Sequence, residues 1–271
     1  MSIKVGIAGA SGRMGRMLLE AIAAGEHDVV LSAAIVRADN ALCGVDTGVW
    51  LGASPSGIVF SEDVQVAIDE VDVLIDFTPP DAAVVNAQYC AERGRSLVSG
   101  TTGFTVAQAE EFRGATQNLA LCQASNFSTG VNLAYRLLAQ AAAILGAEAD
   151  IEISEAHHRH KVDAPSGTAI AMGEVVAGAL GRNLAEVAVY GREGQTGERA
   201  RETIGFSTIR AGDIVGEHTV TFAAQGERLE ITHKASSRMA FARGAIRAAV
   251  WLNNQKPGLY DMQDVLGLKE N

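Results

Sequence analysis

Three of the chain's six histidines lie within four consecutive positions, and an arginine and a lysine stand among them. The cationic stretch reads His157-His158-Arg159-His160-Lys161. Positive charges this close repel one another, so the loop is costly unless an anion lies among them. Histidine titrates near neutral pH, and lysine is a possible proton donor. The stretch therefore predicts a pocket for a small dicarboxylate or phosphate-like ligand, lined by groups that exchange protons.

The segments on either side support this interpretation. Residues 151–156 alternate between apolar and polar, which is typical of a strand that delivers its end to the loop. After the loop, Ser166-Gly167-Thr168 opens an apolar, Ala-rich run that predicts a helix over 166–180. Free amides at a helix start attract anions, so we expect them to contact the same ligand.

Two alternatives stand beside the anion pocket. Such a run is often a solvated surface loop, and histidines at positions i and i+3 also bind zinc. The preceding strand speaks against the first alternative. Against zinc, no cysteine lies nearby, and Arg159 and Lys161 would oppose a cation.

The composition narrows the class of protein. With 271 residues, 48% hydrophobic content and a formal charge of −10, the chain fits an α/β protein whose partner is a small molecule, not a nucleic acid or an anionic membrane. The three cysteines, Cys43, Cys90 and Cys122, form no C-x-x-C pair, which suits a reducing compartment. Neither an export signal nor an apolar window of about 20 residues is present. We expect a soluble, cytoplasmic protein.

The N-terminal region predicts a dinucleotide-binding loop. A short apolar strand over 3–8 runs into a glycine turn, and a helix follows over 14–24. In such a loop the first glycine permits the turn, the second lets a pyrophosphate approach, and the third lets the helix pack closely. The spacing is G-x-x-G-x-x-G, so a glycine-rich turn that binds nothing is the alternative. The turn consists of Gly9, Ala10, Ser11, Gly12, Arg13, Met14 and Gly15.

The end of the second predicted strand, over 27–36, bears on the choice of cofactor. Dinucleotide folds that prefer NADH carry an acidic residue there, which holds the ribose 2′-hydroxyl. Val36 and Arg37 occupy this place, and Asp39 lies slightly beyond. An arginine without a neighbouring carboxylate favours a 2′-phosphate, so NADPH is preferred over NADH. Arg13 and Arg16 are further candidates for the phosphate, or solvated helix residues.

Two more loops follow predicted strands, over 96–99 and 119–123. Ligands of a doubly wound sheet bind beyond the carboxyl ends of its strands. We expect the first loop to contact the nicotinamide ribose, although a plain turn fits its spacing equally well, and the second to face the nicotinamide. The candidate residues are Gly100, Thr101 and Thr102, then Ala124, Ser125, Asn126 and Phe127.

After Phe127 the alternation of strands and helices changes. A long apolar helix is predicted over 130–145, an antiparallel meander over 203–210, 214–224 and 228–235, and a last helix over 239–252. Residues 39–57 are predicted to be an irregular, mobile loop. The fold class is α/β, a Rossmann-like doubly wound parallel sheet domain plus an inserted α+β domain with a mixed open sheet. The predicted domains are 1–127 with 239–271 for the dinucleotide, and 128–238 for substrate binding and oligomerisation.

The histidine stretch within residues 155–169 resembles the signature of the 4-hydroxy-tetrahydrodipicolinate reductase family, long called dihydrodipicolinate reductases, of bacterial lysine and diaminopimelate synthesis. The resemblance spans nearly the whole chain. It includes residues 9–15, 75–78, 100–104, 126–128, 210–218 and 233–238.

The resemblance implies an oxidoreductase that uses NADPH or NADH to reduce 4-hydroxy-tetrahydrodipicolinate, via its dehydrated form, to tetrahydrodipicolinate. It makes His157 the proton donor or acceptor and Lys161 a second donor. His158, Gly167 and Thr168 would hold the substrate carboxylates. Residues 9–14, 37, 100–102 and 124–127 would hold the cofactor. The family is typically a homotetramer joined through the sheet of the second domain, and no metal is implied.

Two other functions remain open. One is an NADP-dependent dehydrogenase of a different small dicarboxylate. The other is a dinucleotide-sensing regulator, which would need an interaction surface or a DNA-binding helix pair. The acidic charge and the proton-transfer residues of the inserted segment speak against the regulator.

Overall fold

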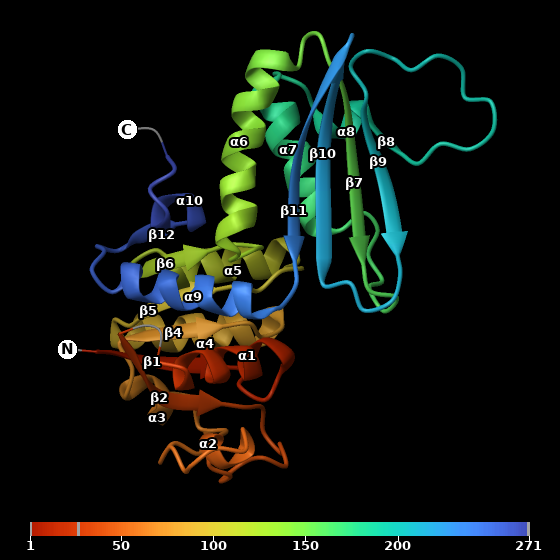
Figure 1. The fold of residues 1–271 in the computed structure, drawn as a ribbon. Coiled ribbons are helices and arrows are strands. Elements are labelled where there is room, and N and C mark those ends of the chain that lie inside the picture. The colour runs from red at the N-terminus through yellow and green to blue at the C-terminus, as the bar shows by residue number, and fades with distance from the viewer. Residues whose placement is uncertain (1, 26–27, 270–271) are drawn as a thin grey trace. The chain divides into compact units, whose positions relative to one another are not determined.

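The computed structural model describes residues 2–25 and 28–269. The chain forms two compact units (Figure 1). The two-segment unit comprises the chain up to Thr129 and again from Arg238, and the inserted unit comprises Gly130–Ser237. Each unit has a sheet of its own.

Seven parallel strands form the sheet of the two-segment unit, in the order β12-β6-β5-β4-β1-β2-β3. The central strands are almost wholly buried, which explains their continuous apolar runs. Strand order reverses beside β1, where doubly wound sheets bind ligands. The strands are β1 (Ile3–Ala8), β2 (Val29–Ile35), β3 (Phe60–Ser61), β4 (Val73–Asp76), β5 (Ser96–Ser99), β6 (Ala120–Gln123) and β12 (Gly258–Tyr260).

Helices cover both faces of this sheet and enclose two apolar cores. One core contains residues of α1 (Arg13–Ala23), α9 (Met239–Leu252) and α10 (Met262–Val265). The other contains residues of α3 (Val64–Asp69), α4 (Pro80–Arg93) and α5 (Val106–Thr116). This double layer confirms the predicted Rossmann-like class.

The segment predicted to be irregular, residues 39–57, contains a short helix, α2 (Thr47–Trp50). The Asp46 carboxylate organises it by accepting backbone N–H groups from Gly48, Val49, Ser56 and Gly57 at 2.8–3.0 Å. These bonds, that from Ser56 first, lower the pKa of Asp46 to about 2. Hydropathy patterns do not show where a side chain caps a helix, so the sequence did not predict this ordered segment.

The inserted unit contains a five-stranded mixed sheet in the order β11-β10-β7-β9-β8. The prediction of an antiparallel meander over three successive strands is wrong, because β7 lies between β9 and β10 and pairs parallel with β9. Parallel neighbours need a crossover, which the helices between β7 and β9 provide. The elements are α6 (Thr129–Leu145), β7 (Asp150–His157), α7 (Gly167–Ala179), α8 (Leu184–Val187), β8 (Ala188–Tyr190), β9 (Ile204–Arg210), β10 (Gly216–Ala224) and β11 (Glu227–Ala235).

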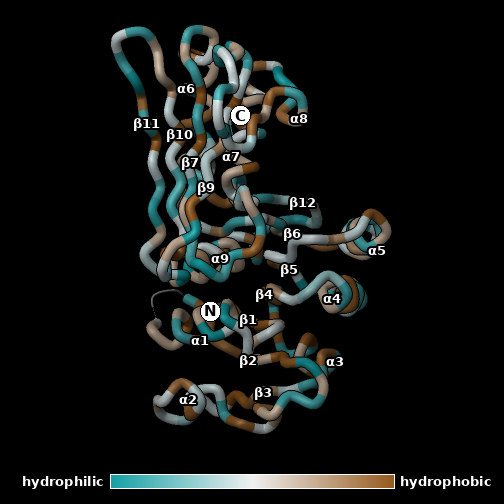
Figure 2. Tube along the Cα trace, turned by 90° about the vertical axis from the view of Figure 1, so that its right-hand side faces the viewer, coloured by the Kyte–Doolittle hydropathy of each residue, from teal (hydrophilic) through white to brown (hydrophobic). Residues whose placement is uncertain are grey.

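One face of this sheet forms the core of the inserted unit with α6 and α7, which lie on the same side of it in Figure 1. Alternate residues of β7, Ile151 and Ile153, belong to this core, as do Val220 and Phe222 of β10. The opposite face is polar and partly exposed. Figure 2 shows both hydrophilic and hydrophobic residues along β11. The opposite face presents Ser154, Ser207, Thr219, Thr221 and Thr232.

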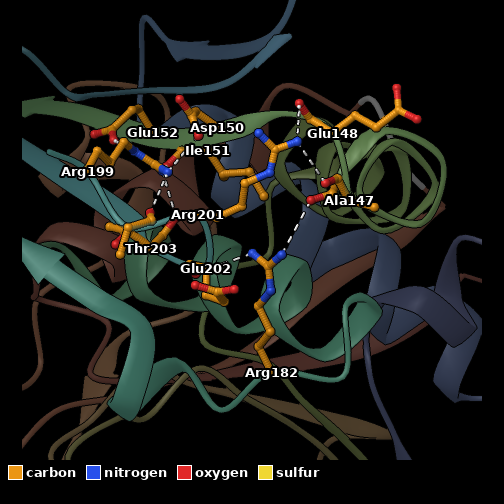
Figure 3. A network of polar contacts seen from close by, with 12 residues as sticks. Ala147, Glu148, Asp150, Ile151, Glu152, Arg182, Arg199, Arg201, Glu202 and Thr203 are labelled. Atoms are coloured by element: carbon orange, nitrogen blue, oxygen red, sulfur yellow. Dashed lines mark hydrogen bonds and ion pairs between the residues drawn. The ribbon is translucent and has the colours of Figure 1, made fainter.

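Three arginines attach the segment before β9 to the junction of α6 and β7 (Figure 3). Arg199 bonds the carbonyls of Ile151 and Thr203 at 3.0 and 2.7 Å and the carboxylate of Asp150 at 2.8 Å. Arg201 and Arg182 donate to carbonyls of the turn just after α6, those of residues 146–148, and Arg182 also donates to the Glu202 carbonyl at 3.3 Å. Cations near a helix C-terminus offset its unpaired carbonyls, so these contacts hold the segment in place.

Candidate active site

The strand pairing of the inserted unit sets polar side chains in rows beyond its apolar core. Glu155 of β7 lies opposite Thr208 of β9 and His218 of β10, and His218 lies opposite His233 of β11. His157 lies opposite Arg210. Side chains two residues apart in a strand share a face, so these rows continue the face that packs on α6 and α7. The site thus begins where the core ends.

Glu155 is the centre of this group and is only 2% exposed. Its Oε2 lies 2.6 Å from Nδ1 of His157, and its Oε1 accepts the backbone N–H of Ser166 at 2.9 Å. Arg210 donates to both oxygens, at 2.8 and 2.7 Å. Burial raises the pKa of the Glu155 carboxyl, but the hydrogen bonds, that from Arg210 first, outweigh it and hold the pKa below its ordinary value. The carboxylate is therefore ionised at neutral pH.

His157 ends β7 and is 8% exposed. Burial lowers its pKa, the Glu155 carboxylate acts in the opposite sense, and Lys161 and Arg210 add to the lowering, so the net pKa lies below that of a free histidine. The Nε2 atom faces Gly216, where a Cβ would approach it to 3.0 Å. The lowered pKa favours a neutral His157 ring, and its Nδ1 is already hydrogen-bonded to Glu155.

A second buried histidine supports the start of α7. His218 lies with its ring centroid 5.0 Å from that of His157, and its Nε2 shares a hydrogen bond of 2.9 Å with Oγ of Ser166. Burial, with a smaller effect of His157, lowers the pKa of His218 to about 4. Ser166 is also the N-cap of α7, because its Oγ accepts the N–H of Ala169.

The loop between β7 and α7 is less cationic than its sequence suggested. Lys161 Nζ lies 2.9 Å from the Asp163 carboxylate, and Arg159 and His160 are exposed. The prediction from charge crowding overlooked Asp163 and Glu155. His158 is half-buried, and the predicted carboxylate-binding residues Gly167 and Thr168 form the first turn of α7. All five predicted catalytic and substrate residues thus come from one connected segment.

The predicted cofactor residues all lie in the two-segment unit, at strand ends. Gly9 has a φ of 74°, which permits the turn after β1, and a Cβ on Gly15 would overlap the carbonyl oxygens of Gly9 and Ala10. Helix α1 follows with Gly12 as its N-cap, which offers no side-chain cap. Uncapped amides at a helix start suit a pyrophosphate, so this turn fits a dinucleotide.

The side chains around this turn distinguish the candidate arginines. Arg37 is exposed just beyond β2, and Ser11 accepts a hydrogen bond of 3.2 Å from Asn40 in the same region. Arg16 bonds Glu20 at 2.8 Å and lies over the Trp50 ring at 5.2 Å. All three arginines are exposed, and Arg16 has a structural role on its own helix surface.

Asp76, fully buried at the end of β4, ties two of the strand-end loops together. It accepts the N–H and hydroxyl of Thr78 at 2.7 and 2.6 Å and the amide of Asn86 at 2.8 Å. Thr101 in turn donates to the Thr78 carbonyl at 2.9 Å. Burial raises the pKa of Asp76 despite these bonds. Thr102, in contrast, is exposed.

The Phe127 ring does not match the expected contact with nicotinamide. It is 1% exposed and packs edge-to-face on Phe77 at 5.6 Å within the core. A Cβ on Gly244 of α9 would overlap the Phe127 carbonyl, which shows how closely that helix approaches. A large aromatic ring stabilises the protein more when it packs in the core than when it is exposed in a loop. Ala124 and Asn126 are partly exposed and Ser125 is exposed.

The sequence pattern gave no role to Glu155, Arg210 and His218, although they surround the predicted histidine. One signal was present: Glu155 precedes His157 by two residues in a predicted strand, so both must share a face. The partners from β9 and β10 depend on strand pairing, which the sequence pattern predicted wrongly. Among residues 2–25 and 28–269, no group of three or more His, Cys, Asp or Glu side chains is placed to hold a metal ion.

A doubly wound sheet with an uncapped glycine turn, joined to an inserted unit with a buried histidine, is the architecture of a nicotinamide-dependent oxidoreductase. Two family models cover nearly the whole chain: dihydrodipicolinate reductase, N-terminus, over residues 3–127, and C-terminus, over residues 130–266. A relative from Saccharophagus degradans, 4-hydroxy-tetrahydrodipicolinate reductase, is 56% identical over 99% of this chain and 100% of its own.

Solved structures agree. The dipicolinate-bound dihydrodipicolinate reductase from Paenisporosarcina sp. TG-14 has a TM-score of 0.75 at 25% identity, covering 97% of this chain and 99% of its own. A probable dehydrogenase from Thermotoga maritima shares the fold, with a TM-score of 0.60 at 11% identity over 97% of this chain and 92% of its own. The chain belongs to the dihydrodipicolinate reductase family.

It is an oxidoreductase with 4-hydroxy-tetrahydrodipicolinate reductase activity in lysine biosynthesis, and the family implies a nicotinamide cofactor. No helix in the described ranges is long and apolar enough to cross a bilayer.

Proposed function

We propose that His157 and Lys161 are the proton-transfer residues of the reduction. The observation that carries this proposal is the buried His157 ring, bonded through Nδ1 to Glu155 at 2.6 Å and followed within one loop by Lys161 and the start of α7. Hydride addition to a conjugated imine develops negative charge that a nearby acid must neutralise. Lys161 is only partly exposed, and its ion pair with Asp163 restrains the ammonium group.

The substrate of this site is a small cyclic dicarboxylate. The start of α7 supports this, because Gly167 and Thr168 supply amides at the positive end of a helix of 13 residues. His158 precedes them on the same loop. The relative from Paenisporosarcina is described as dipicolinate-bound, which is a ligand of this chemistry.

The cofactor is NADPH, with NADH as the weaker substitute. Bound at the β1 turn, the reduced nicotinamide nucleotide supplies the hydride. Residues 9–14 would hold its pyrophosphate, residues 100–102 and 124–126 would line its nicotinamide half, and Arg37 would pair with the 2′-phosphate. The support for this preference is the exposed Arg37 directly after Val36, the position where folds that prefer NADH carry an acidic residue. Asp39 and Glu62 lie close by, and the Glu62 carboxylate accepts the Asp39 N–H at 3.3 Å.

Absorbance loss of each cofactor tests the whole proposal, with 4-hydroxy-tetrahydrodipicolinate made in situ by the preceding synthase. We expect rapid oxidation of NADPH and slower oxidation of NADH. Faster oxidation of NADH would overturn the role of Arg37. Binding of both cofactors without oxidation would overturn the substrate and favour another dicarboxylate dehydrogenase.

The polar face of the inserted sheet is also the proposed interface of a homotetramer. Its side chains are polar: hydroxyl groups lie beside the carboxylate of Glu152 and the ion pair of Glu217 with Lys234. Thr219 and Thr232 share a hydrogen bond of 2.9 Å between β10 and β11. We expect this face to pair with the same face of a second copy.

A further inference from the structure

The proposed proton-transfer histidine is held by a carboxylate and a guanidinium group that have no role in the steps above. Glu155 bonds His157 through one oxygen and the backbone of Ser166 through the other. Ser166 is the N-cap of α7. One buried carboxylate therefore joins the proton-transfer residue to the helix start proposed to hold the substrate.

The charge state of this carboxylate decides which nitrogen of His157 carries the proton. Arg210 donates to both oxygens of Glu155, and it also donates to the Asp163 carbonyl at 2.6 Å, so its fork is fixed. An ionised carboxylate only accepts hydrogen bonds. The His157 nitrogen at 2.6 Å must therefore be the donor, which leaves Nε2 as the nitrogen that gains and loses a proton.

We propose that Glu155, fixed by Arg210, is a positioning residue of the reductase: it sets the tautomer and orientation of His157 and holds the start of α7. Its negative charge also stabilises the doubly protonated imidazolium, the form that donates a proton from Nε2. The inference rests on the proposed role of His157 and adds to it a residue outside the predicted site.

Charged and titratable groups approach His157 from every strand around it. Removing the Glu155 charge would leave two cations beside the ring, so the neutral ring would be favoured down to lower pH. His218 does not compensate, since its low pKa keeps it neutral. The groups are Glu155 on β7, Arg210 on β9, His218 on β10, His233 behind it on β11, and Lys161 in the loop.

Glu155→Gln is the decisive variant. Glutamine has the same shape and keeps an oxygen for the Ser166 N–H, but it can offer an amide N–H to Nδ1, which favours the opposite tautomer. We expect kcat to fall about 10–100-fold, the loss found when the carboxylate partner of a metal-bound histidine is removed. KM should change much less, and the limb of the pH profile that depends on His157 should move to lower pH.

Glu152→Gln is the matched control. Glu152 lies on the same strand and is bonded by Arg192 at 2.8 and 2.9 Å and by Arg199 at 3.0 Å, so it too is a carboxylate held by arginines. It alternates with Glu155 and faces the other side of the sheet. This variant should keep the wild-type pH profile.

The tautomer itself gives a readout that does not depend on turnover. In protein with ¹⁵N-labelled imidazole rings, with His157 assigned by comparison with His157→Gln, we expect a protonated Nδ1 in the wild type and a protonated Nε2 in Glu155→Gln. If the chain failed to reduce the substrate, the proposed function would fall while this result still stood.

Glu155→Gln leaves Arg210 without its carboxylate and could unfold the site. If Glu155→Gln does not fold, the double variant Glu155→Gln/Arg210→Gln, which removes both charges, is used to measure the His157 tautomer. An unchanged His157 tautomer and an unchanged pH profile in a folded variant would overturn the proposal. The expected tautomer change with wild-type kcat would restrict Glu155 to a structural role and overturn its catalytic importance.

Discussion

The imidazole of His157 and the ammonium group of Lys161 should matter to chemistry far more than to cofactor binding, because both belong to the inserted unit. We expect His157→Gln and Lys161→Ala each to lower turnover by about 10²–10⁴-fold, the usual range for a positioned acid. Steady-state rates and NADPH titration by fluorescence check this. Equal losses of cofactor affinity in both variants would argue that these residues shape the cofactor site.

Arg37 is the residue on which cofactor choice depends. Arg37→Ala should lower the efficiency with NADPH by about 10–100-fold and leave that with NADH nearly unchanged, because a hydrogen bond to a charged group contributes about 1.5–3 kcal/mol. Arg16→Ala is the control, since Arg16 pairs with Glu20. If Arg37→Ala lowered the efficiency with NADPH and NADH equally, Arg37 would not be the residue that binds the 2′-phosphate.

At the scale of an element, the junction of β1 and α1 depends on the absence of a side chain at Gly15. Gly15→Ala would press a methyl group on the carbonyls of Gly9 and Ala10, so α1 must shift. We expect weaker NADPH binding and a lower Tm. Gly114→Ala in α5, where nothing lies within 4 Å, should instead stabilise the protein by about 0.5–1 kcal/mol. Calorimetry and cofactor titration separate the two outcomes.

The α2 segment should respond to pH through Asp46. Its folded pKa of about 2 lies below the ordinary value of 3.8, so its stabilising contribution is complete above pH 4 and is lost as the pH falls towards 2. Asp46→Asn should therefore be less stable than the wild type at pH 7, and the difference in Tm should shrink by pH 3. A difference that stays constant over this range would contradict the assignment.

At the scale of the whole molecule, the polar face of the inserted sheet should determine assembly. We expect light scattering to give four chains per particle for the wild type. Thr219→Glu would bring like charges together wherever that face meets its own copy, and smaller particles should result. Val106→Glu, at an exposed position of the two-segment unit, is the control. A wild-type monomer would refute the tetramer.

Local patterns predicted most of the fold. The strands ending at Asp76, Ser99 and Gln123 and the helix over Met239–Leu252 follow from apolar runs and turn residues. Strand β12 was missed because three residues show no period. The predicted antiparallel meander was wrong because a hydropathy pattern indicates where a strand lies in the sequence but not which strands pair with it.

The candidate site divides into the part that local sequence indicates and the part that depends on strand pairing. The histidine loop and the glycine turn are contiguous in sequence, so their residue types reveal them. Glu155, Arg210 and His218 come together only through pairing between β7, β9 and β10. Phe127 was misjudged because its position at a strand end says nothing about where its ring is buried.

Glu155 and His157 lie two residues apart on a central strand, so enzymatic activity after refolding depends on the register of that strand. If β7 slipped by one residue against β9, both side chains would turn away from Arg210 towards the opposite face. A chain with native helix content but a slipped β7 strand would be inactive as a reductase. The yield of correctly folded molecules after denaturation is therefore best counted by turnover, because circular dichroism would count both populations.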